Sequence, residues 1–151
     1  MALIPEFNIP EFIEESLKTD HESNFKRSID FDFKEGGIRR DGKNNLANAN
    51  FIKTFNDWIV KALSTERGTC DFYSDNYGAE FEKIFRMKDR KQQEMAIEKT
   101  VTETILADDL KRARYINGFK FNWQVDSVEV KFNVFTDKGE LPIIYNIEKR
   151  R

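Results

Sequence analysis

The chain has 151 residues, 34% of them charged, and a formal net charge of −2 at pH 7. That length predicts one domain with a substantial core, and the near-neutral charge gives no bulk attraction to nucleic acid. A single cysteine, Cys70, excludes an internal disulfide, and the single histidine, His21, leaves no metal-site spacing. The sequence shows neither a membrane-spanning apolar run nor a secretory signal pattern. We therefore expect a protein of a reducing compartment without metal or cofactor.

Residues 1–27 differ from the rest and predict an extended N-terminal arm. The tetrapeptide Ile-Pro-Glu-Phe ends at Phe7 and recurs ending at Phe12, and its prolines favour extended backbone. Two interpretations stay open. Either the arm lies over the surface of its own domain, or Phe7 and Phe12 dock on a neighbouring subunit, because a monomer gains little from exposing them. Residues 28–151 are expected to form a single domain.

A strand pair is predicted at the start of that domain. Ile29, Phe31 and Phe33 alternate with polar residues, which is typical of a half-buried strand. A two-glycine turn at Gly36 follows, and a short return strand is expected after it.

Helices are predicted in the middle of the chain. The strongest pattern covers residues 51–63, where apolar residues recur at spacings of three and four, and Gly68 is well placed to end that helix. A shorter helix is expected at about 78–87 and a third at about 92–108. The expected core residues are Phe55, Trp58, Ile59, Leu63, Phe81, Ile105, Phe121 and Phe132.

Beyond Ile116 the hydrophobic period changes to two, with turn residues between the alternating segments. This pattern predicts an antiparallel meander of three strands, the last at Leu141–Ile147. Pro142 has no N–H to donate and favours an edge position for that strand. The predicted class is α+β: an N-terminal strand pair and about three helices packed on a C-terminal three-stranded antiparallel meander.

No residue pattern predicts catalysis. A glycosidase needs two carboxylates that flank a cleft. Glu66 and Asp71 lie in the loop after the first helix, but acidic residues are abundant in this chain. Cys70 and His21 lie in different segments, so a thiol nucleophile with a nearby base is not expected. A peptidoglycan-cleaving, lysozyme-like enzyme is kept as the alternative function.

The loop after the first helix holds the most informative residues. One interpretation is structural: Arg67 interacts with the helix C-terminus or with an acid, while Glu66 holds the loop. The other is that one of the two side chains reaches a partner protein. Tyrosines in the same loop are open to the same two interpretations. The loop signature comprises Glu66, Arg67, Tyr73, Tyr77 and Gly78.

In their order and spacing these segments resemble the wedge proteins of contractile phage-tail baseplates, the sheath-initiator or lysozyme-like family. Relatives of that family occur in phage-like bacteriocins and in type VI secretion baseplates. The resemblance runs from about Ile29 to Ile147. In the family the third helix leads into an acidic turn, an arginine and a Gly-Phe strand start, which appear here as Asp109, Arg112 and Gly118. Family members often have Glu/Asp-Pro-Arg at this junction, whereas this chain has no proline there.

The resemblance implies a structural, non-enzymatic component of the baseplate of a virion or tail-like particle, synthesised in the bacterial cytoplasm. It implies several copies per particle, contacts with the tail sheath protein and other wedge proteins, and the tail tube as a further candidate partner. No cofactor, nucleic acid or membrane is implied.

The implied mechanism is β-augmentation, in which a strand of the first sheath subunits pairs with an open sheet edge. The last strand is the candidate edge, and charged substitutions at Leu141 and Ile143 are expected to block sheath initiation without unfolding the domain. The other interpretation is that this strand closes the domain's own sheet. The expected interface residues are Leu141, Ile143, Tyr145 and Ile147, with Phe7 and Phe12 of the arm.

Overall fold

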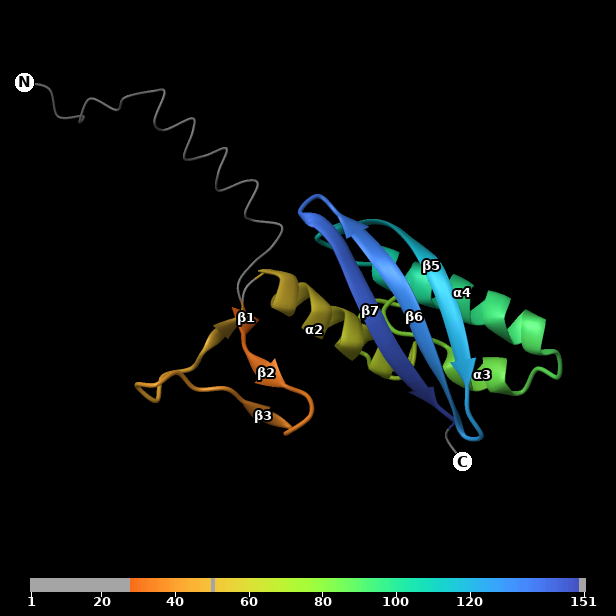
Figure 1. Ribbon diagram of the computed structural model, residues 1–151, viewed down its shortest axis with the longest axis horizontal. Coiled ribbons are helices and arrows are strands. Elements are labelled where there is room, and N and C mark those ends of the chain that lie inside the picture. The colour runs from red at the N-terminus through yellow and green to blue at the C-terminus, as the bar shows by residue number, and fades with distance from the viewer. Residues whose placement is uncertain (1–27, 50, 150–151) are drawn as a thin grey trace, which may run out of the picture.

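The computed structural model describes residues 28–49 and 51–149, so the predicted arm at 1–27 lies outside the described residues. A hairpin comes first in these residues, helices follow, and an antiparallel sheet ends the fold (Figure 1). The predicted α+β class is confirmed. None of the described helices is long and apolar enough to cross a membrane.

The C-terminal sheet is the three-stranded antiparallel meander that the sequence predicts. Its strands are β5 (Ala113–Trp123), β6 (Ser127–Thr136) and β7 (Gly139–Glu148), in the spatial order β5-β6-β7. The β6–β7 ladder continues without irregularity from the pair Ser127 and Glu148 to the pair Thr136 and Gly139. Because side chains of a strand alternate between faces, one face of the sheet is buried and the other is exposed.

The helices of the described residues are α2 (Phe51–Ser64), α3 (Phe81–Phe85) and α4 (Arg90–Leu106). Figure 1 shows the sheet lying in front of these helices. Helix α3 begins later than predicted because Ala79 N–H donates to the carbonyl of Thr65 instead of joining a helical turn. Helix α4 begins earlier than predicted, with Asp89 as its N-cap.

One hydrophobic core joins the helices to the buried face of the sheet. Most of the predicted core is confirmed as buried: Phe55, Ile59, Leu63, Phe81, Ile105 and Phe132. Trp58 and Phe121 are only partly buried and pack against the margin of this core. The buried face of the sheet adds Val128, Val130, Val134, Ile143 and Ile147.

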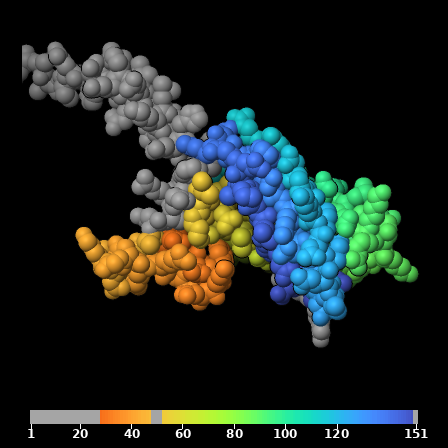
Figure 2. All heavy atoms as spheres, viewed as in Figure 1, coloured from red at the N-terminus to blue at the C-terminus, as the bar shows by residue number. Residues whose placement is uncertain are grey.

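The N-terminal hairpin, residues 28–49, confirms the predicted strand pair. Strand β1 (Ser28–Ile29) pairs with β4 (Asn48–Ala49), and β2 (Phe31–Asp32) pairs with β3 (Gly37–Ile38), both antiparallel. In Figure 2 the hairpin, in orange, projects beside α2 and away from the sheet.

The prediction that this strand is half-buried is wrong for two of its three apolar residues. Ile29 is 44% exposed and Phe33 is 48% exposed, whereas Phe31 is half-buried. The hairpin contacts α2 through its β1 and β4 strands. Since the sheet does not cover its other side, the alternating apolar pattern does not lead to burial.

Lys53 of α2 ties the hairpin to the rest of the domain. Its ammonium donates to the carbonyl of Phe31 at 2.9 Å and to the carboxylate of Asp57 at 2.6 Å, with the Asp30 carboxylate 3.4 Å away. Lys53→Met keeps the apolar stem and removes the charged donor. We expect hydrogen exchange in the hairpin, at the Arg39 amide for example, to become about tenfold faster while global stability changes little.

Lys99→Met is the matched control, because Lys99 makes only a 3.8 Å ion pair with Glu103 from an exposed position. Exchange rates in the hairpin are expected to match the wild type in that variant. Unchanged hairpin exchange in Lys53→Met would show that apolar contacts alone hold the hairpin on α2.

Candidate functional site

The outer edge of β7 is the candidate functional site. In the described residues β7 pairs with β6 alone. One position beyond the last pair of the ladder, Lys149 N–H donates to the carbonyl of Asp126 at 2.9 Å. In an antiparallel ladder, hydrogen-bonded pairs alternate with non-hydrogen-bonded pairs. The odd-numbered residues of β7 therefore bond to β6, and the even-numbered residues direct their backbone groups to the outer edge.

Five residues present the backbone of this edge: Glu140, Pro142, Ile144, Asn146 and Glu148. Pro142 is the exception among them, because it offers a carbonyl but no N–H. Its position costs the β6–β7 ladder nothing and agrees with the edge placement that its sequence context predicts. A paired strand therefore finds an uninterrupted set of donors and acceptors over Ile144–Glu148.

The opposite edge of the sheet, on β5, is less suited to a partner strand. The β5–β6 register shifts twice, and Gly118 in the second irregular stretch has a φ of 72°. Irregular edges of this kind disfavour pairing with another chain. Trp123 also donates its indole N–H to Glu94 of α4 at 2.8 Å, and Arg90 lies 4.1 Å from the Trp123 ring centroid. These contacts tie β5 to α4.

The predicted interface residues of β7 point toward the helices. Ile143 and Ile147 are buried, each with 4% of its surface exposed, whereas Leu141 and Tyr145 are half-buried. The expectation that a charge at Ile143 leaves the domain folded is wrong, because that side chain belongs to the core. Phe7 and Phe12, the interface residues predicted on the arm, lie outside the described residues.

The loop signature closes a backbone contact between the end of α2 and the start of α3. Glu66 and Ala79 form an isolated parallel bridge, in which Arg67 N–H donates to the Ala79 carbonyl at 3.1 Å. The Arg67 side chain donates to the Gly78 carbonyl at 3.1 Å and lies 3.6 Å from the Glu103 carboxylate. These contacts support the structural interpretation of Arg67.

The two tyrosines of the signature stack on each other, with ring centroids 4.3 Å apart. Tyr77 also meets Trp58 edge to face at 6.0 Å, and the Lys61 ammonium lies 5.3 Å from the Tyr73 ring centroid. Burial raises the pKa of Tyr77, while contact with Tyr73 raises the pKa of Lys61. Both tyrosines line a cleft of about 990 Å³ between the hairpin and α2.

At the junction between α4 and β5, Arg112 pairs with Asp108 and not with the predicted Asp109. Arg112 donates to the two Asp108 carboxylate oxygens at 2.8 and 3.0 Å, and both side chains are buried. The guanidinium lies 4.6 Å from the Phe55 ring centroid and 5.3 Å from that of Trp58. Asp109 is exposed. The sequence analysis therefore missed the acid of the buried pair.

The fold and its open edge define a small α+β domain that has an ordered core and offers one strand for pairing. A family model described as the contractile injection system sheath initiator matches residues 27–139. No curated protein matches the sequence. The chain belongs to the family of contractile injection system sheath initiators, as its resemblance indicated. Its role is structural, in the tail or baseplate of such a system, where sheath and baseplate proteins are its partners.

Proposed function

We propose that this chain joins wedge proteins near the tail tube and templates the first sheath ring by β-augmentation at β7. An extended segment of a sheath subunit adds a fourth strand beside Ile144–Glu148. Backbone hydrogen bonds supply affinity, and alternating side-chain contacts supply register. The chain acts in several copies, one for each sheath subunit that begins the ring.

The observation that carries this proposal is the orientation of the β7 backbone. Its even-numbered residues turn their N–H and C=O groups away from β6, and the ladder on the other side has no bulge. A regular edge of this length is a hazard for aggregation unless a partner covers it. The odd-numbered side chains anchor the strand in the core, so the edge is held rigid before a partner arrives.

Asn146→Pro tests the proposal without touching the core. It removes one edge N–H and leaves the bonds to β6 in place, as Pro142 already does on the same strand. We expect thermal stability close to wild type and at least a tenfold loss of sheathed particles, roughly what a lost backbone bond plus a ring clash produces. The measurement is electron microscopy of particles co-expressed with sheath, tube and wedge proteins.

Asn146→Ala is the matched control, because it removes the same side chain but keeps the edge N–H. Normal sheath assembly is expected with that variant. If Asn146→Pro also assembles sheath normally, pairing at this edge is not the mechanism.

The enzymatic alternative is separated by a clearing assay on purified peptidoglycan. Glu66 lines a groove beside β7, but Asp71, its presumed companion carboxylate, is exposed and is not among the residues of that groove. A turnover of peptidoglycan by the isolated chain that is lost in Glu66→Gln would support the lysozyme-like function instead.

A further inference from the structure

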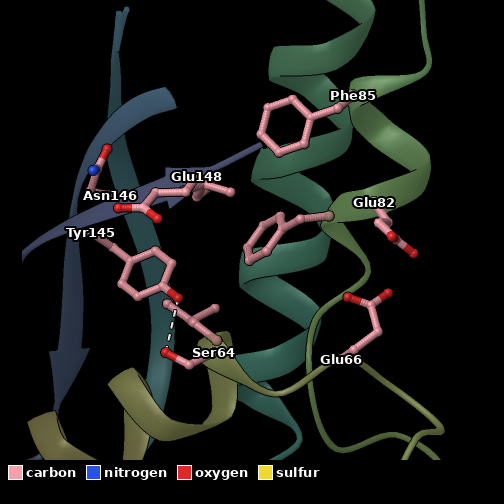
Figure 3. Close-up of a pocket in the computed structure, with 10 residues that line it drawn as sticks. Ser64, Glu66, Glu82, Phe85, Tyr145, Asn146 and Glu148 are labelled. Carbon is pink, nitrogen blue, oxygen red and sulfur yellow. Dashed lines mark hydrogen bonds between the residues drawn. The ribbon is translucent and has the colours of Figure 1, made fainter. Parts of the chain in front are cut away.

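A groove of about 360 Å³ runs beside the edge of β7, at the Ile144–Glu148 end where pairing is uninterrupted. One wall is β7 itself, and the others are the C-terminal end of α2, the loop at Glu66 and helix α3 (Figure 3). Its floor is apolar and aromatic, with Phe81 and Tyr145 at a ring-centroid distance of 6.4 Å. Ser64 and Tyr145 fix the floor through a 3.0 Å hydrogen bond between their hydroxyls.

The charges around this groove are mostly negative. Its lining includes the carboxylates of Glu66, Glu82 and Glu148 but no lysine or arginine. Figure 3 shows Glu82 on α3 and Glu148 on β7 on opposite sides of the space. The nearest printed cation is the Lys149 ammonium, 5.7 Å from the Phe85 ring centroid. Three carboxylates against one ammonium leave the groove net negative.

The position of the groove decides which part of a bound strand enters it. The odd-numbered side chains of β7, such as Tyr145 and Ile147, point toward the helices. In a paired strand, the residues opposite them point the same way. One such residue of a strand beside Ile144–Glu148 therefore extends down into the groove, with its stem along the aromatic rings and its end near the carboxylates.

We propose that this groove selects a sheath strand that carries arginine or lysine at its inward-facing position, and thereby fixes the register of that strand on β7. The inference rests on the proposed edge pairing and adds its specificity. A long basic side chain matches both parts of the groove, because its methylene stem packs on apolar surface while its cation meets the carboxylates. Without such a marker, a strand of alternating residues slides by two positions at little cost.

The test uses the full chain and three synthetic peptides of one alternating valine–threonine host. The central residue is arginine, its neutral isostere citrulline, or glutamate, and binding is followed by fluorescence anisotropy and by NMR at millimolar concentration. We expect the arginine peptide to bind about five- to tenfold more tightly than the citrulline peptide, and the glutamate peptide to bind most weakly. The preference should shrink at about 0.5 M salt because screening shortens the reach of the carboxylates.

Two variants of the chain locate the preference. The double variant Glu82→Gln, Glu148→Gln is expected to bind arginine and citrulline peptides alike, with the citrulline affinity unchanged. Glu35→Gln, Glu98→Gln is its control, because it changes the net charge equally at exposed positions away from the groove. The control is expected to keep the preference for arginine.

Failure of this inference is distinct from failure of the proposed function. Equal binding of arginine and citrulline peptides to the wild type overturns the groove inference, while loss of both in Asn146→Pro leaves edge pairing standing. An arginine preference that survives in Glu82→Gln, Glu148→Gln also overturns it. If none of the three peptides binds the wild type, both the groove inference and edge pairing are rejected.

Discussion

Replacing Arg112 with methionine is expected to lower the free energy of unfolding by about 3–5 kcal/mol, the usual cost of leaving one member of a buried ion pair without its partner. Asp108 is only 2% exposed and Arg112 only 4% exposed. The carboxylate also accepts the N–H groups of Leu110 and Arg112, so it organises the turn that joins α4 to β5. Methionine fills the space over Phe55 but leaves the charge of Asp108 unbalanced.

Urea denaturation of Arg112→Met beside Arg114→Met provides the measurement and its control. Arg114 lies two residues away and pairs with Asp137, but its side chain is 68% exposed. That substitution is expected to change stability by no more than about 0.5 kcal/mol. The double variant Asp108→Asn, Arg112→Met should cost clearly less than the sum of its single variants, because it removes both charges. Equal losses for the two arginines would contradict a buried pair.

Local periodicity was enough to predict the sheet and the strongest helix. A strand with one buried face must alternate, and β6 and β7 do so over their whole length. What alternation cannot show is where the backbone of the same strand points. The sequence analysis placed the partner contact on Leu141 and Ile143, whose side chains face the core. The edge is formed by the even-numbered residues between them, and the hydrogen-bond register identifies these.

The buried pair at the junction depends on a turn that the sequence does not announce. Lys111 adopts a φ of 51°, which is uncommon for a residue with a side chain and folds the chain back so that Arg112 meets Asp108. Two adjacent aspartates precede the arginine, and their sequence gives no reason to prefer the first. The i, i+4 spacing of Asp108 was the available signal, although such spacing is informative mainly within helices.

The groove beside β7 was beyond prediction for a different reason. Glu66, Glu82 and Glu148 come from three elements, and only the packing of α3 against the sheet brings them to one space. Acidic residues are so common in this chain that no spacing marks these as a group. Tertiary packing, and not local pattern, creates the charge of the candidate site.

Gly78→Ala is the second substitution with a large expected effect. Gly78 has a φ of 98°, and a Cβ added there would lie 2.7 Å from the carbonyl oxygen of Thr65 and 3.1 Å from the backbone of Arg67. Those atoms belong to the bridge between the ends of α2 and α3, so they cannot move without breaking it. The carbonyl of Gly78 is held as well, because the hydroxyl of the buried Thr104 donates to it at 2.8 Å.

Gly68→Ala separates the clash from the backbone strain. Gly68 also has a positive φ, 75°, but an added Cβ there meets nothing within 4 Å. Its substitution is expected to cost only about 1 kcal/mol, the usual strain of a left-handed alanine. Gly78→Ala should cost about 3 kcal/mol or more, since strain and a backbone collision add. Urea denaturation midpoints measure both. If the two variants are equally stable, the contact between the loop and Gly78 does not constrain the fold, and the order of the signature residues needs another explanation.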